Sequence, residues 1–168
     1  VQGMNLPEEF EKFITKDINL DLSTNEPFIT DSQVNKLAKQ ILSCDRPTLY
    51  VGGGIRLSDS YQEFIDFLAD WPISTVTGWN SNDLLSDEHN CYAGRPGSVG
   101  NRAGNFSVQL SDCVLIVGCR LNIRQLSFNW ESFARNAWTC HVDIDNSELD
   151  KPFLNTDLKV LSTVKGLF

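Results

Sequence analysis

The sequence has few positively charged residues and no long hydrophobic run. Its 168 residues include 14 Lys and Arg against 22 Asp and Glu, which gives a net charge of −8 at pH 7. This balance disfavours nucleic acid or an anionic membrane surface as the main partner, because both need clustered Lys and Arg. No apolar stretch approaches the ~20 residues of a membrane span, and the opening VQGMNLPEEF lacks the regions of a signal peptide. We therefore predict no nucleic-acid partner and no membrane partner.

Cysteine and histidine are scarce and are not arranged as a metal site. The five cysteines contain no CxxC pair, and the two histidines are not spaced with them as zinc ligands usually are. An odd number of cysteines, three of them in or beside apolar runs, is typical of small buried side chains in a reducing compartment. We therefore expect a cytoplasmic protein with no metal-ligating residues.

Recognisable catalytic motifs are also missing. No serine stands in a nucleophile elbow, and no Ser-His-Asp or Cys-His set is evident. His89 lies in the polar segment SDEHN, and His141 lies in the middle of an apolar run, where a histidine is usually a hydrogen-bonded core residue. The glycine-rich segment VGGGIRLSDS contains neither GxGxxG nor the Lys-Ser/Thr of a phosphate-binding P-loop. We predict no catalytic residues in this chain.

Strand-like and helix-like segments alternate from residue 30 to the end of the sequence. Strands are expected over 48–52, 73–77, 91–94, 113–118, 138–145 and 157–161, and helices over 30–42, 59–69 and 102–111. Strands that are apolar on both faces and separated by amphipathic helices are typical of a parallel sheet covered on both sides. We predict an α/β fold, a three-layer, doubly wound, Rossmann-like sheet of five to six parallel strands flanked by helices.

The helical pattern also predicts which side chains face the core. In the first helix, Thr30 and Gln33 have the spacing of a capping box. The apolar residues expected on one stripe of this helix are Val34, Leu37, Ala38, Ile41 and Leu42. In the helix over 102–111, the residues expected to face inward are Ala103, Phe106 and Leu110.

The candidate binding residues lie in five loops that follow predicted strands. Ligands of open parallel sheets bind beyond the carboxyl ends of the strands, so these loops are expected to converge along one edge. The loops are Gly52-Gly53-Gly54, Thr77-Gly78-Trp79-Asn80, residues 94–104, Gly118-Cys119-Arg120 and Asp143-Ile144-Asp145. Their convergence is a stronger signal than any one of them alone.

Each loop has a binding interpretation and a structural one. The three glycines allow close approach of a phosphate or ribose, or only a sharp strand-to-helix turn. Asp143 and Asp145 suit ribose hydroxyls; alternatively, Asp145 caps a short helix that begins at NSELD and Asp143 is solvated. Arg95 and Arg102 suit a pyrophosphate, or they pair with nearby acidic residues. These residues alone leave the alternatives open.

Taken in order, four segments resemble the central domain of thiamine-diphosphate-dependent enzymes, above all the acetolactate synthase (acetohydroxyacid synthase) group. The segments are RPTLYVGGGI, DEHNCYAGRPGSVGNRAGN, DCVLIVGCRLNIRQ and HVDIDNSELDK. Their order and spacing make the resemblance specific, and it covers about residues 30–168. The leading VQG is similar to the seam after the preceding domain of such enzymes. The resemblance therefore implies that 1–29 are a linker or arm from a preceding domain and that 30–168 are the central domain.

This resemblance implies a longer parent enzyme. Such a parent is a transferase or lyase that acts on a 2-keto acid such as pyruvate, and it forms a homo-oligomer. It binds thiamine diphosphate and Mg²⁺ between a pyrimidine-binding and a pyrophosphate-binding domain, which would be the partners of this chain. The GDG…N metal motif of the latter domain does not occur in this sequence. The resemblance therefore implies a non-catalytic scaffold domain that is inactive by itself.

The resemblance also implies a nucleotide cleft, since some relatives bind FAD in this domain, others ADP and others nothing. The matching positions are Gly52, Gly53, Gly54, Thr77, Gly78, Gly97, Arg120, Asp143 and Asp145. Residues 119–124 keep two arginines of the family's Ala-Arg-Phe-Asp-Asp-Arg but lack both acids, and residues 94–97 replace a Gly-Met-His-Gly type of loop. A stand-alone FAD- or ADP-binding module and an interaction domain that binds no small molecule are the alternatives.

Overall fold

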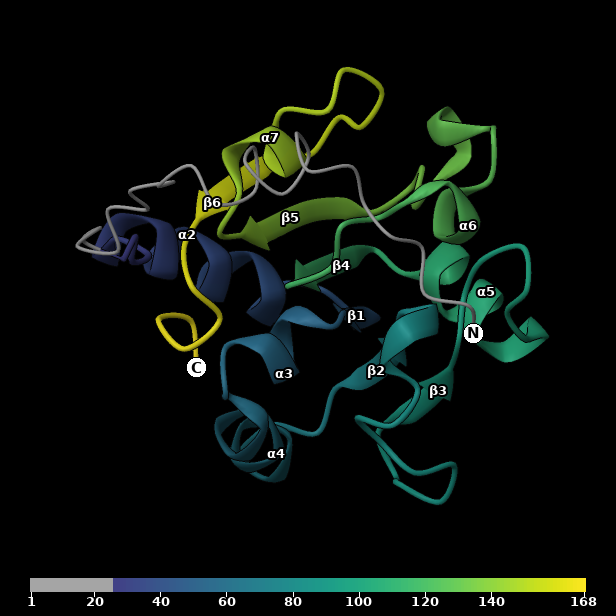
Figure 1. Cartoon of the computed structure of the whole chain (residues 1–168), viewed down its shortest axis with the longest axis horizontal. Coiled ribbons are helices and arrows are strands. Elements are labelled where there is room, and N and C mark those ends of the chain that lie inside the picture. Colours follow the sequence, from purple (N-terminus) through teal and green to yellow (C-terminus); the bar gives the residue numbers. More distant parts are fainter. Residues whose placement is uncertain (1–25) are drawn as a thin grey trace, which may run out of the picture.

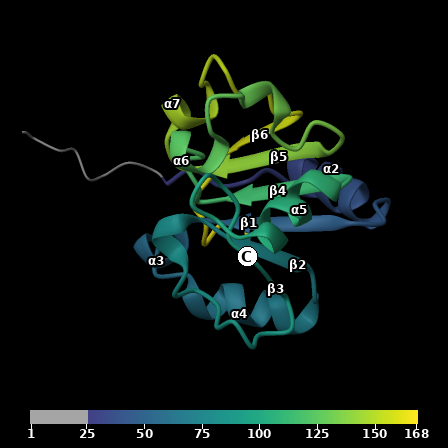
Figure 2. The ribbon, with the colours of Figure 1, turned by 90° about the vertical axis from the view of Figure 1, so that its right-hand side faces the viewer.

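Six parallel strands form one sheet in the computed structural model, which describes residues 26–168 (Figure 1). The strands are β1 (Pro47–Val51), β2 (Ser74–Thr77), β3 (Tyr92–Gly94), β4 (Cys113–Val117), β5 (Trp138–Asp143) and β6 (Leu158–Leu161). Their order across the sheet is β3-β2-β1-β4-β5-β6, and every neighbouring pair is parallel. Figure 2 shows this order from β6 in yellow to β3 in teal. The predicted doubly wound α/β fold is confirmed, with six strands.

Helices cover both faces of this sheet. They are α2 (Asp31–Leu42), α3 (Gly54–Leu57), α4 (Tyr61–Asp70), α5 (Arg102–Leu110), α6 (Ile123–Leu126) and α7 (Asn146–Leu149), with 3₁₀ turns η1 (Trp79–Ser81) and η2 (Trp130–Ser132). One core cluster joins α2 and α4 to the sheet, and a second joins α5 and α6 to its other face. Every residue of β4 is buried, which explains why CVLIV shows no polar alternation.

The first helix begins as its sequence predicts. Thr30 accepts a hydrogen bond from the Gln33 amide at 3.3 Å, and the Gln33 side chain accepts one from the Thr30 amide at 3.0 Å. The predicted capping box is therefore present. Of the predicted stripe, Leu37 and Ile41 are buried in the core as expected, but Val34 and Leu42 are exposed.

The predicted inward face of α5 is wrong. Ala103, Phe106 and Leu110 are all exposed, and the helix buries Gly104 and Val108 instead. A Cβ atom at Gly104 would lie 2.5 Å from the backbone of Arg95, so the helix packs most closely at its glycine. A pattern of apolar side chains does not detect such a contact, because glycine has none.

The predicted arm over residues 1–29 falls mostly outside the described residues. Within them, the segment just before α2 packs against the loop after β6. The Ile29 amide donates to Ser162 Oγ at 3.1 Å, and the Thr163 amide donates to the Pro27 carbonyl at 3.0 Å. Among residues 26–168, no helix has the length and apolar character needed to cross a membrane.

Candidate functional site

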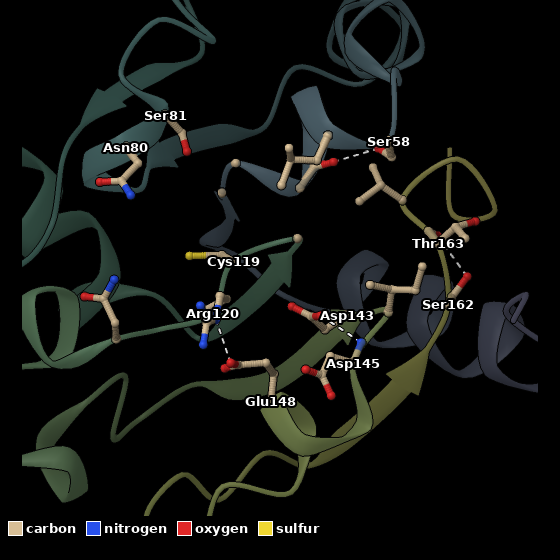
Figure 3. Close-up of a pocket in the computed structure, with 18 of the residues that line it drawn as sticks. Ser58, Asn80, Ser81, Cys119, Arg120, Asp143, Asp145, Glu148, Ser162 and Thr163 are labelled. Carbon is tan, nitrogen blue, oxygen red and sulfur yellow. Dashed lines mark hydrogen bonds and ion pairs between the residues drawn. The ribbon is translucent and has the colours of Figure 1, made fainter. Parts of the chain in front are cut away.

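A cleft of about 950 Å³ opens at the carboxyl ends of the strands (Figure 3). It lies at β1 and β4, where the chain reverses its direction of progress across the sheet and where such folds bind ligands. The residues that line it after the strands include Gly52, Gly53, Gly54, Trp79, Asn80, Ser81, Gly118, Cys119, Arg120, Asp143, Ile144, Asp145, Ser162, Thr163 and Lys165. Four of the five loops predicted to converge therefore do so, and the loop over 94–104 does not line this cleft.

Two of the three consecutive glycines are required by the protein's own packing. A Cβ atom at Gly52 would lie 2.3 Å from the Gly118 carbonyl oxygen, and one at Gly54 would lie 2.6 Å from Gly118 Cα. The Gly54 amide donates to that carbonyl at 2.9 Å. Gly118 itself has φ of +55°, which favours glycine. The turns after β1 and β4 are thus pressed together, backbone against backbone.

Gly53 differs from its two neighbours. Its φ of −61° and ψ of −16° are open to any residue, and the nearest atom to an added Cβ would be Ser81 Oγ at 3.8 Å. Gly53 and Ser81 both line the cleft, so a methyl group at position 53 would occupy cleft space. Packing within residues 26–168 gives no reason for a glycine here, whereas close approach of a ligand would give one.

The two aspartates after β5 have distinct structural roles. Asp145 is the N-cap of α7, and its carboxylate accepts a hydrogen bond from the Ser147 amide at 2.8 Å. Asp143 accepts one from the Asp145 amide at 3.0 Å. The capping interpretation of Asp145 is confirmed. The expectation that Asp143 is solvated is wrong, because it is only 8% exposed at the end of a buried strand.

Arg120 is held at the cleft by a carboxylate that the sequence analysis did not single out. Its Nε lies 2.6 Å from Glu148 Oε1, and Lys151 contacts both the other oxygen of Glu148 and the Arg120 carbonyl. Figure 3 shows Glu148, Asp143 and Asp145 together on one side of the cleft. Burial would raise the pKa of Glu148, but the hydrogen bonds and charges of Lys151 and Arg120 outweigh it and lower that pKa. Glu148 therefore stays ionised.

The structure does not place Thr77, the last residue of β2, or Gly78, the residue after it, in the lining of the cleft. Thr77 is fully buried, its hydroxyl has no partner among the described residues, and it does not line the cleft. Gly78 is not among the lining residues either, and a Cβ atom there would be 2.6 Å from Gln125 Nε2. Gln125 lines the cleft and donates to Cys119 Sγ at 3.2 Å. Burial raises the pKa of the Cys119 thiol to about 11, so it remains protonated at neutral pH.

Gly97 lies in a second, smaller pocket. This pocket of about 200 Å³ is lined by residues of the loop after β3, of α5 and of the segment from α6 to η2. Gly97 has φ of +112°, and its amide donates to Asn105 Oδ1 at 3.0 Å. The structure therefore does not bring Gly97 together with the other predicted site residues. Gln125 lines both spaces.

The arginines of the loop over 94–104 are not part of the cleft either. Within residues 26–168, neither Arg95 nor Arg102 forms an ion pair, and Arg102 lies over the ring of Phe106 at 5.2 Å. The expected pairing with nearby acidic residues is therefore not found in that part of the chain. His141 is a buried core residue, as predicted, and its Nε2 lies 3.0 Å from the Cys119 carbonyl oxygen.

Sequence reasoning missed three parts of the cleft lining. The loop after β6, Gln125 and Glu148 all contribute to it. The segment STVKG after β6 has hydroxyl side chains but follows a weakly patterned strand. The spacing of Glu148 and Lys151, three residues apart, was the available signal for an ion pair on α7.

The sequence is similar to those of known proteins. The sequence model of the family described as "Thiamine pyrophosphate enzyme, central domain" matches residues 34–167. The probable acetolactate synthase large subunit of Methanococcus aeolicus is 31% identical over 133 residues, which are 79% of this chain and 22% of that protein. The acetolactate synthase large subunit of Lactococcus lactis subsp. lactis is 30% identical over 169 residues, 97% of this chain and 29% of that protein. The acetolactate synthase isozyme 2 large subunit of Escherichia coli is 29% identical over 147 residues, which are 82% of this chain and 27% of that protein. The chain thus spans about a quarter of the length of these relatives.

Proposed function

Because the chain belongs to the family of thiamine pyrophosphate enzyme central domains, we propose that it is the non-catalytic, scaffolding domain of an acetolactate-synthase-like enzyme. The parent would act on a 2-keto acid such as pyruvate and would form a homo-oligomer. Residues 1–29 would be the linker from a preceding domain and 30–168 the central domain. The relatives named acetolactate synthase support this proposal, since they align with most of this chain and are about three to four times as long.

Thiamine diphosphate and Mg²⁺ would be held by the other two domains of the parent, the pyrimidine-binding and pyrophosphate-binding domains. The residues of this chain do not fit either group. The sequence contains no GDG motif, and residues 26–168 contain no group of three or more His, Cys, Asp or Glu side chains that would hold a metal ion. We therefore assign this chain no step of the thiamine chemistry.

The cleft itself would take the adenosine diphosphate part of a nucleotide such as ADP or FAD. Gly53 is the observation on which this depends, because its missing side chain leaves space that residues 26–168 do not fill. The buried carboxylate of Asp143 would accept hydrogen bonds from ribose hydroxyls. Arg120, whose side chain is 77% exposed, would turn to a phosphate. A bound nucleotide would supply no reaction chemistry and would join the loops after β1, β4 and β5.

Calorimetric titration of ADP into the 168-residue chain tests this proposal. We expect measurable binding, and at 100 times the Kd the free energy of unfolding should rise by about 2.7 kcal/mol. Gly53→Ala should weaken ADP binding at least tenfold while leaving the melting temperature of the free protein unchanged. Ser32→Ala is the control, since Ser32 is exposed on α2 and lines neither the cleft nor the smaller pocket. Unaltered ADP affinity in Gly53→Ala, or no binding at millimolar ADP, would contradict the nucleotide cleft.

A further inference from the structure

Gln125 stands between the two hollow regions of the molecule. It lines the large cleft, and it also lines the pocket of about 200 Å³ that contains Gly97. We propose that Gln125 and the short helix α6 form a partition that restricts the cleft to a single nucleoside diphosphate. The inference rests on the proposed nucleotide cleft and adds a residue that determines the length of the ligand.

The side chain of Gln125 is fixed at both ends of its amide. Its oxygen accepts a hydrogen bond from the Asn122 amide at 2.9 Å, as the reciprocal half of the capping box of α6. Its nitrogen donates to Cys119 Sγ at 3.2 Å. Gly78 leaves room for this nitrogen, since a Cβ atom at that position would lie only 2.6 Å from it. The loops after β2 and β4 thus hold Gln125 in one orientation.

Helix α6 separates the loop after β3 from the cleft. The amide and hydroxyl of Ser98 both donate to the Arg124 carbonyl at 2.9 Å. A Cβ atom at Gly97 would lie 2.5 Å from the same carbonyl oxygen. The Arg124 guanidinium lies over the ring of Trp79, 4.6 Å from its centre, and Trp79 lines the cleft. The loop with Gly97 therefore packs on α6 instead of reaching the cleft.

The two spaces differ in chemistry. The large cleft contains carboxylates and the Arg120 guanidinium, which suit ribose hydroxyls and phosphates. The smaller pocket is lined by amide and hydroxyl side chains, Asn105, Gln109 and Ser132, and by apolar ones, Val108, Leu126 and Phe133. Such a lining suits an uncharged heteroaromatic ring with hydrogen-bonding edges. Removing the partition would join a space for the first half of a dinucleotide to a space for its second half.

The test compares the affinities of ADP and FAD in calorimetric titrations of the 168-residue chain. In the unaltered chain, FAD should bind no more tightly than ADP, because its flavin half is excluded. Gln125→Ala should raise the ratio of FAD affinity to ADP affinity at least tenfold. Gln109→Ala is the matched control, since Gln109 lines only the smaller pocket, and it should leave the ratio as it is in the unaltered chain.

A second variant opens the partition without altering Gln125. In Gly78→Ala, the new methyl group would displace the Gln125 amide, because its other neighbours lie at 3.5 and 3.6 Å. The ratio of FAD affinity to ADP affinity should rise in this variant too. Gly78→Ala therefore tests the proposal even if Gln125→Ala does not fold. The partition is contradicted if the folded variants bind ADP with an unchanged ratio of FAD to ADP affinity. It is also contradicted if the unaltered chain binds FAD ten times more tightly than ADP. Neither result would contradict the nucleotide cleft itself. Failure of the unaltered chain to bind ADP overturns both.

Discussion

On the β1–β4 side of the cleft, backbone packs against backbone, whereas on the β5–β6 side charged side chains hold the loops together. Gly52, Gly54 and Gly118 approach so closely that added Cβ atoms would lie within 3 Å of backbone. On the β5–β6 side, Glu148 of α7 pairs with Lys151 and with Arg120, which reaches it from the loop after β4. Close packing transmits any added volume as strain, while ion pairs respond to pH and to conservative changes of charge. Substitutions on the two sides should therefore lower the stability of the fold in different ways.

The largest expected effect is that of Gly52→Ala. The new methyl group would meet the Gly118 carbonyl oxygen at 2.3 Å and Cys119 Cα at 2.5 Å, so one turn must move. We expect a loss of about 3 kcal/mol in the free energy of unfolding, at the upper end for an overpacked site. Urea titration followed by circular dichroism measures this loss. Gly53→Ala is the control, and it should change stability by less than about 0.5 kcal/mol. Equal losses in the two variants would mean that the steric distinction between these glycines does not hold.

Glu148→Gln should have a smaller effect that depends on pH. The pKa of Glu148 is lowered in the folded protein, so the unfolded chain binds its proton more readily. Its contribution to stability is present above the ordinary glutamate pKa of about 4.3 and is lost as pH falls through the lower folded value. The variant should lose about 2 kcal/mol at pH 7, the value of hydrogen bonds to a charged group. At pH values below the folded-state pKa of Glu148, the variant and the unaltered chain should have nearly the same free energy of unfolding.

Melting curves from pH 7 down to pH 3 measure this dependence. Asp83→Asn provides the matched control, because Asp83 forms an ion pair with Arg56 in which both side chains are largely exposed. Exposed pairs contribute little, so this control should run parallel to the unaltered chain. A constant difference between Glu148→Gln and the unaltered chain at all pH values would mean that the charge of Glu148 does not matter.

The sequence predicted the inner strands of the sheet well because they are buried on both faces. Segments such as CVLIV and LYV have no polar alternation and are too short for a helix, which leaves buried strands. The capping box at Thr30 was equally readable, since both partners lie within one turn. The buried face of α5 could not be predicted in this way, because Gly104 forms the helix's closest contact without a side chain. Local patterns therefore predicted elements better than orientations.

The candidate site was predictable only where its residues directly follow strands. Topology alone brings Gly52, Arg120 and Asp143 to one edge. Gly97 follows a strand too, yet it is directed away from the cleft by the contact of Ser98 with Arg124, a contact between residues 26 positions apart. The pairing of Arg120 with Glu148 spans 28 positions. Contacts over such separations depend on how loops pack in the folded chain, and local sequence patterns do not encode them.

The smallest effect is expected at Asp145, where two substitutions separate capping from charge. Asp145→Ala removes the acceptor of the Ser147 amide hydrogen bond and should cost about 1 kcal/mol, the usual value of an N-cap. Asp145→Asn keeps an acceptor oxygen and should lower the free energy of unfolding by only a few tenths of a kcal/mol. Urea titration of both variants at pH 7 measures the difference. If both lost the same stability, the charge of Asp145 would matter more than its hydrogen bond. The β5–β6 side of the cleft would then depend on electrostatics even at its helix cap, which would sharpen its contrast with the glycine-packed side.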